Sequence, residues 1–238
     1  MLSVFKCLFG FLGRKTLGHM KKYFLSLLGL FLYVGTANAQ QFPMNDYGEI
    51  EFSEIVETNL SSKELFANAQ EWIARIFGDY KSVIQFEDSE NGKLVLKGST
   101  PIDFTSATVK VDGVTGMSTK ERINYTLTIE CKDGKYRYRL NDVFVIRTYD
   151  ILGSIVHSKP ISPLDNLSKI AEYDNELKSL QAIDVSKLKK KKLEEHNKKI
   201  EDAIKHKTEK EIFYNLEYET LNNLITSLKR AMSINNDF

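Results

Sequence analysis

The sequence has few of the residues that build metal sites, disulfide frameworks and reactive thiols. Its 238 residues include only 2 cysteines and 4 histidines. Cys7 lies in an N-terminal leader, so Cys131 is the single cysteine of the remaining chain and no internal disulfide can form there. His196 and His206 have no cysteine or carboxylate at ligand spacing, which argues against a zinc motif. We therefore expect no metal site.

The chain also lacks the short motifs that accompany common enzyme reactions. It contains no H-E-x-x-H, G-x-S-x-G, phosphate-binding loop or G-x-G-x-x-G pattern. Cys131 falls on the apolar side of a predicted strand, where it acts as a small hydrophobic residue. We therefore expect no enzyme, no catalytic residue and no cofactor. The alternative is an envelope hydrolase of unfamiliar pattern, with a carboxylate or histidine of perturbed pKa in a cleft.

The leader, residues 1–39, predicts export. Two lysines follow Met20, an apolar run covers residues 23–34, and an A-x-A cleavage site ends at Ala39. The run is shorter than the about 20 residues of a membrane-spanning helix, which favours cleavage before Gln40 over an uncleaved anchor. We interpret Met20 as the true start. We expect a periplasmic or secreted protein with no stable membrane span after cleavage.

Removal of the leader leaves a chain with an excess of acidic residues. The full chain has 33 basic and 32 acidic residues, and all the charged residues of the leader are basic. The net charge of the chain without its leader is therefore about −4. The run Lys189–Lys192 is followed by glutamates at helical spacing, which indicates a solvated helix face. Nucleic-acid binding depends on Lys and Arg that neutralise phosphates, so we expect none. A nucleic-acid binder is kept as a second alternative.

The composition changes near residue 160 and predicts two parts. Residues 40–160 are rich in β-forming and aromatic residues, whereas residues 161–238 are helical and highly charged. Ser61 and Glu64 form a capping box that predicts a helix ending at Gly78. Strands are predicted on either side of it, over residues 50–57, 82–87, 93–97 and 102–111.

The stretch from Arg122 to Leu140 predicts a β-hairpin. Apolar and polar residues alternate along it, and Asp133-Gly134 supplies the tight turn. If the turn is the whole loop, Lys132 lies opposite Lys135 and the rest of the register follows, with a bulge near residues 141–142. This register places Cys131, Tyr136 and Tyr138 on the buried, helix-covered face and Arg137 and Arg139 on the opposite, wetter face.

Three arginines of the hairpin are the candidate ligand-binding residues. Arg122, Arg137 and Arg139 share its polar face and could bind an anionic group. The alternative is an ordinary solvated sheet face, because Glu130 and several threonines lie among them.

The C-terminal part predicts three helices. They cover residues 163–182, 186–207 and 209–231. The last helix, about 209–233, has a broad apolar stripe and is expected to pack on the β-rich domain. Residues 186–207 are too polar for that and are expected to project as a solvated arm.

Three segments carry a family resemblance: "FSEIVETNLSSKELFANAQEWIARIF", "KSVIQFEDSENGKLVLKG" and "RINYTLTIECKDGKYRYRLNDV". They resemble an exported bacterial family of unknown function with a TATA-binding-protein-like (TBP-like) fold, over roughly Glu51–Tyr149. The resemblance implies a curved antiparallel sheet with helices on its convex side, and it implies no activity. The C-terminal extension lies outside the resemblance.

These observations predict an α+β fold: an antiparallel sheet of about six strands, covered by helices on one face, with a helical C-terminal extension. The expected function is a non-catalytic binding or scaffolding module of the bacterial envelope. Its partner is expected to be an envelope protein or a glycan.

Overall fold

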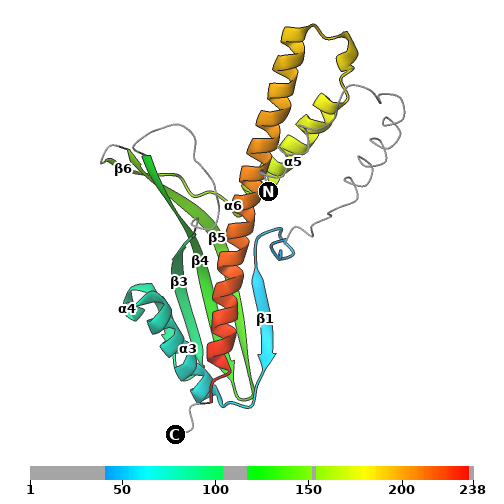
Figure 1. Cartoon of the computed structure of the whole chain (residues 1–238). Helices are drawn as coiled ribbons and strands as arrows, with labels where there is room; N and C mark the ends of the chain where they lie inside the picture. The colour runs from blue at the N-terminus through cyan, green and yellow to red at the C-terminus, as the bar shows by residue number, and fades with distance from the viewer. Residues whose placement is uncertain (1–40, 104–116, 152–153, 236–238) are drawn as a thin grey trace, which may run out of the picture. The chain divides into compact units, whose positions relative to one another are not determined.

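The computed structural model describes residues 41–103, 117–151 and 154–235. The predicted leader and signal peptide lie outside these residues. Figure 1 shows a sheet, helices against one of its faces and a helical hairpin that extends beyond it. The elements in chain order are β1 (Phe52–Glu57), α3 (Ser62–Phe77), α4 (Tyr80–Val83), β2 (Ile84–Asp88), β3 (Lys93–Pro101), β4 (Met117–Lys132), β5 (Lys135–Ile151), β6 (Ser154–His157), α5 (Pro163–Gln181), the short 3-10 helix η1 (Val185–Lys187) and α6 (Lys190–Met232).

The sheet has six strands and every pairing in it is antiparallel. Five strands follow the order β1-β5-β4-β3-β2, and β6 pairs with the far end of β5. Helix α3 and the C-terminal half of α6 lie against the same face (Figure 1). The predicted fold class, an antiparallel sheet covered by helices on one face, is confirmed.

The hairpin at the centre of the sheet has the predicted register. Lys132 pairs with Lys135, Cys131 with Tyr136 and Glu130 with Arg137. The register shifts between Asn124 and Thr126, so β5 carries one extra residue there, and Asp142 adopts a positive φ of 52°. The predicted bulge is therefore confirmed, and its extra residue realigns the alternation of the two strands beyond it.

Helix α3 begins and ends where its sequence predicts. Ser61 accepts a hydrogen bond from the backbone N–H of Glu64, and the Glu64 side chain accepts one from Ser61. Gly78 ends the helix with a φ of 72°, a conformation that costs glycine little. The helix then buries Leu65, Trp72 and Ile73 against the sheet, so local capping and amphipathic burial agree.

The core lies between the sheet and these two helices. Strands β3, β4 and β5 contribute one face, and α6 completes the core from the far end of the chain. The indole N–H of Trp72 donates to the hydroxyl of Ser227 on α6 at 2.9 Å, which ties α3 to α6. The α6 residues in the core are Tyr214, Leu221, Leu224, Ile225, Leu228, Ala231 and Met232.

The strands around the hairpin differ from the prediction in three places. Residues 80–83 form the short helix α4, because the Asp79 side chain caps it by accepting hydrogen bonds from the backbone N–H groups of Lys81 and Ser82. Strand β2 therefore starts at Ile84 and not at Ser82. Strand β3 continues through Pro101, because pairing with β4 extends to Arg122. The third difference is β6, which the sequence analysis does not predict. Most of the predicted strand 102–111 lies outside the described residues.

The prediction of two separate helices over residues 186–207 and 209–231 is wrong. Residues 190–232 form the single helix α6. No glycine or proline interrupts this range, and Thr208 donates its hydroxyl to the carbonyl oxygen of Ile204 within the helix. The apolar stripe changes partner along α6 while the backbone continues.

The N-terminal half of α6 pairs with α5 in an antiparallel hairpin, defined here as the helical arm (Figure 1). Tyr173 stacks on His206 with ring centroids 5.9 Å apart, and the Lys207 ammonium lies 2.7 Å from Asp174. His196 and Ala203 are buried in this pairing. Residues 186–207 are thus largely exposed, as a solvated arm requires, but they have a helical partner.

Candidate functional site

The side of the sheet away from α3 and α6 carries the predicted ligand residues. We define the open face as the register positions of β1, β2, β3, β4 and β5 on the side away from α3 and α6, from the row of Arg122 to the turn at Asp133. Antiparallel partners share a side of the sheet, so the register assigns these positions. Its basic residues are Lys93, Lys97, Arg122, Lys132, Lys135, Arg137 and Arg139, and its acidic residues are Glu57, Asp88 and Glu130.

The structure brings two of the three predicted arginines together. Arg137 and Arg139 are alternate residues of β5, whose side chains are 43% and 44% exposed. Arg122 lies eight residues from Glu130 along β4, which is about 26 Å for an extended strand. Arg122 therefore belongs to the far end of the open face and cannot share a small ligand with the other two.

Each of the three arginines already has a polar partner. Arg137 donates to Glu130 from Nε at 2.6 Å and pairs with it through a second nitrogen. Arg139 lies 3.7 Å from Glu51, and Arg122 donates to the hydroxyl and carbonyl of Ser99. These contacts leave the arginines partly exposed and hold their side chains in place.

A groove of about 360 Å³ lies at the turn end of the open face. Arg137 is on its wall, and Ile55 of the edge strand β1 contributes an apolar side chain that is 60% exposed. Sequence reasoning missed the lysines of this groove. The predicted pairing of Lys132 with Lys135 already placed them on the side of Arg137. The lining residues are Ile55, Asn91, Lys93, Glu130, Cys131, Lys132, Lys135, Tyr136 and Arg137.

Glu130 is the one acidic side chain in the groove wall, and its surroundings keep it ionised. Partial burial raises its pKa, but the hydrogen bond from Arg137 and the positive charges of Arg137, Lys93 and Arg139 outweigh that effect. The net result is a pKa below the usual value of a glutamate. Such a carboxylate is a weak proton acceptor at neutral pH.

The thiol of Cys131 faces the core and not the groove. Cys131 is 2% exposed, and burial raises the pKa of its thiol to about 12. The predicted buried position of Cys131, Tyr136 and Tyr138 is confirmed. A thiol in this setting is a small hydrophobic group and not a nucleophile.

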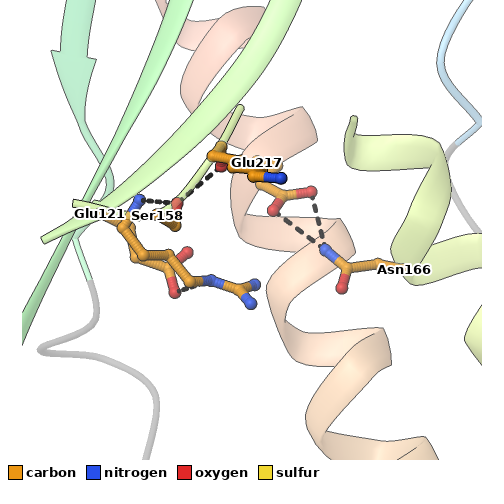
Figure 2. Close-up of polar contacts among 6 residues, drawn as sticks. Glu121, Ser158, Asn166 and Glu217 are labelled. Carbon is orange, nitrogen blue, oxygen red and sulfur yellow. Dashed lines mark hydrogen bonds and ion pairs between the residues drawn. The ribbon is translucent and has the colours of Figure 1, made fainter. Parts of the chain in front are cut away.

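A second polar group of residues is buried where the helical arm meets the sheet (Figure 2). Arg147 of β5 donates from Nε to Glu121 of β4 at 2.6 Å, and its backbone N–H donates to the Ser158 hydroxyl at 3.0 Å. Asn166 of α5 donates from Nδ2 to both carboxyl oxygens of Glu217 on α6, at 3.0 and 3.1 Å. We call Glu121, Arg147, Asn166 and Glu217 the junction cluster, because they come from four different elements.

The carboxyl groups of the junction cluster are strongly desolvated. Glu217 is 1% exposed, and burial raises its pKa to about 8, although the hydrogen bond from Asn166 acts in the opposite direction. Burial also raises the pKa of Glu121, against the attraction of Arg147. Lys210 of α6 is nearby, and burial lowers its pKa. The cluster is enclosed by protein, so it serves as an internal contact between sheet and helices rather than as a site open to a ligand.

No three His, Cys, Asp or Glu side chains of the described residues gather in a way that could hold a metal ion. Among the helices in that part of the chain, none is both long enough and apolar enough to cross a membrane.

Residues 52–145 match the sequence profile of a family described as a domain of unknown function (DUF4468) with TBP-like fold. These residues are similar to that family. The resemblance of Glu51–Tyr149 to such a family is thereby confirmed, together with its TBP-like fold.

Two crystal structures are similar to the chain. A DUF4468 family protein from Bacteroides ovatus is 20% identical, with a TM-score of 0.35, over 51% of this chain and 66% of that chain. A TBP-like protein from Parabacteroides distasonis is 18% identical, with a TM-score of 0.46, over 80% of this chain and 96% of that chain. A comparison with curated proteins gives no match.

The residues that match DUF4468 include the whole groove lining but only one residue of the junction cluster, Glu121. The matched range ends at Val145, so it covers Glu130, Lys132 and Arg137 but not Arg147, Asn166 or Glu217. Helix α6, which completes the core, also lies beyond the matched residues.

Proposed function

We propose that the protein is an exported, non-catalytic binding module of the bacterial envelope and that it binds through the open face of its DUF4468 domain. Export rests on the leader, in which a basic start at Met20, an apolar run and an A-x-A site precede Gln40. Binding rests on the groove and on the distribution of charge around it.

The segregation of charge is the observation that carries the proposal. Residues 40–160 contain more acidic than basic residues, yet basic side chains outnumber acidic ones on the open face. Lys97, Lys132 and Lys135 form no salt bridge with any residue that the structure describes. A face with unpaired positive charge on a net negative protein favours a negatively charged partner.

The groove is better suited to binding than to catalysis. Its carboxylate, Glu130, is held ionised between Lys93 and Arg137, and the thiol of Cys131 points to the other side of the sheet. A hydrolytic site needs a nucleophile or activated water beside a base whose pKa is matched to the working pH. The described groove residues do not supply that pair.

Site-specific photo-crosslinking in the cells that export the protein tests the proposal. A photoreactive residue at Thr128, in the middle of the open face, should form a discrete adduct, whereas one at Lys198 on the exposed helical arm should not. The double substitution Lys132→Glu and Lys135→Glu should reduce the Thr128 adduct at least fivefold. The matched control, Lys190→Glu with Lys191→Glu, makes the same change of charge on the arm and should leave the adduct unchanged.

An adduct at Lys198 with none at Thr128 would contradict the assignment to the open face. Turnover of a substrate that depends on Glu130 would contradict the non-catalytic function.

A further inference from the structure

The positive charges of the open face form a track along the strands and not a single cluster. Lys132 and Lys135 lie beside the turn, Lys93 and Arg137 share the next row, and Arg139 and Lys97 follow on later rows. Residues on one side of a strand repeat every 6.6–6.8 Å or so, and ten residues of β4 separate Lys132 from Arg122, about 33 Å. A track of this length fits a linear polymer better than a small ligand.

Uncharged hydrogen-bonding groups lie beside the charges on the later rows. Thr128 lies between Val95 and Arg139, and Thr126 lies between Lys97 and Asn141. Hydroxyl and amide side chains both donate and accept hydrogen bonds, so they can match the hydroxyl groups of a sugar. The uncharged polar residues of the open face are Ser53, Ser99, Asn124, Thr126, Thr128 and Asn141.

The density of charge along the track is moderate. Glu130 offsets Arg137, and Glu51 lies 3.7 Å from Arg139, so the unpaired cations are spaced along the face and not adjacent on every row. A polymer with one carboxylate on each sugar or on alternate sugars carries charge at a similar density. Arginine also presents its donors in the planar fork that binds a carboxylate at two points.

Two other classes of macromolecule fit this face less well. Sequence-tolerant binding of single-stranded nucleic acid relies on exposed aromatic rings that stack on bases, whereas the centre of the open face is built from threonine, arginine, glutamate and Val95. Protein interfaces have apolar, aromatic centres, whereas the exposed apolar side chains Ile55 and Phe86 lie on opposite margins of this face.

We propose that the open face binds a linear, carboxylate-bearing polysaccharide that lies along β4 and β5. This inference rests on the proposed function and specifies its ligand class. The groove holds one sugar carboxylate near Lys132 and Lys135, and the chain of sugars continues over Thr128 toward Lys97.

Binding of defined polymers to the protein exported with its own leader tests the inference. Polygalacturonate is the acidic polysaccharide, neutral dextran the uncharged one, and oligo-dT and poly-glutamate represent the other two classes. Affinities are measured by titration calorimetry at low and at physiological salt. We expect polygalacturonate to bind more tightly than either oligo-dT or poly-glutamate, dextran not to bind, and affinity to fall several-fold as salt rises.

Variants locate the site. Lys132→Glu with Lys135→Glu should weaken polygalacturonate binding at least tenfold, and Lys190→Glu with Lys191→Glu should change it less than twofold. Thr128→Ala should weaken binding without altering the salt dependence, because it removes a hydroxyl and no charge.

Three results would overturn the inference. Equal losses in both double variants would show non-specific attraction, and tighter binding of oligo-dT or poly-glutamate would assign the face to a nucleic acid or an acidic protein. Absence of binding to all polymers, with the Thr128 crosslink retained in cells, would reject the polysaccharide and keep the proposed function. Absence of both would reject the two together.

Discussion

At the scale of single residues, burial decides chemistry that residue type alone leaves open. Cys131 could serve as a nucleophile in an electropositive, partly open site, but it is 2% exposed beside Tyr136, and burial raises the pKa of its thiol. Glu130 is a carboxylate at a neighbouring position of the same strand, and it stays ionised because its side chain points to the basic open face.

We expect the thiol of Cys131 to react with a thiol reagent only when the protein unfolds. In native protein at pH 8, labelling should be at least a hundredfold slower than in protein unfolded in urea, and Cys131→Ala should lower the free energy of unfolding by about 1 kcal/mol. A colorimetric thiol assay follows the labelling and urea unfolding gives the stability. Rapid labelling of native protein would show that the thiol is exposed.

Gly98 is required because a ring occupies the place of its side chain. A Cβ atom at Gly98 would lie 2.3 Å from the ring of Tyr125, its partner on β4, whose hydroxyl is 2.8 Å from the hydroxyl of Thr100. Tyr125 is 2% exposed, so its ring is packed in the core. The clash is with a packed ring, so a larger residue at 98 must displace it.

We expect Gly98→Ala to lower the free energy of unfolding by about 1–3 kcal/mol. The double variant Gly98→Ala with Tyr125→Leu should be more stable than the sum of the two single changes predicts, because the smaller side chain removes the clash. Urea unfolding of the four proteins of this cycle gives the coupling. Additive losses would show that the ring is not what excludes a side chain.

At the scale of elements, the junction cluster joins α5 and α6 to the sheet. Asn166 contributes a neutral donor to Glu217, and the charged groups around that carboxyl are Glu121 of β4, Arg147 of β5 and Lys210 of α6. Arg147 also lies over the ring of Phe213 at 5.3 Å from its centroid. The charges of the sheet therefore act on Glu217 where the helices meet it, and this interaction depends on the protonation of its carboxyl.

We expect Glu217 to make the protein less stable as pH rises from about 4.5 toward 8. Its pKa is raised to about 8 in the folded protein, so the folded state holds the proton more tightly than the unfolded state. The stabilisation is complete below the unfolded pKa and is lost as pH rises through the folded one. Its size is on the order of a few kcal/mol.

Glu217→Gln should remove most of this pH dependence, because glutamine is a neutral isostere that can still bond to Asn166. Urea unfolding at pH 5, 7 and 9 measures the slope for the wild type, the variant and a control, Glu219→Gln, which is exposed on the same helix. An unchanged slope in Glu217→Gln would show that its carboxyl does not titrate in this range.

At the scale of the whole molecule, the two faces of one sheet have separate roles. The covered face carries the apolar core with α3 and α6, and the open face carries exposed polar and charged side chains. Strand alternation produces this division, because successive side chains point to opposite sides. Side chains of the open face can therefore vary without disturbing the core.

We expect the exported protein to begin at Gln40. N-terminal sequencing of the envelope and culture fractions should give a chain starting "QQFPMN", because the A-x-A site ends at Ala39. Substitution of Ala39 by a bulky residue should retain the leader on the chain. A cytoplasmic protein that keeps its Met20 start would contradict export.

The sequence by itself determined the local features that depend on neighbours along the chain. The capping box at Ser61, the stop at Gly78, the Asp-Gly turn and the bulge at Asp142 could all be predicted, because each follows from short-range geometry and from period-two alternation. The pairing of Lys132 with Lys135 followed from the same turn.

Only the tertiary structure decided what depends on distant residues. Nothing local shows that Lys93 and Arg137 lie on either side of Glu130, that Glu217 meets Asn166, or that Gly98 faces the ring of Tyr125. The continuity of α6 was missed because its apolar stripe changes partner from α5 to the sheet midway, and a change of partner resembles a break in the pattern.

The net charge of residues 40–160 also gives no indication of the basic face. It is negative, whereas the pairing of β1–β5 places basic side chains together on one side of the sheet. The physical reason is common to all of these: strand pairing and helix packing bring together residues whose separation in sequence carries no local signal.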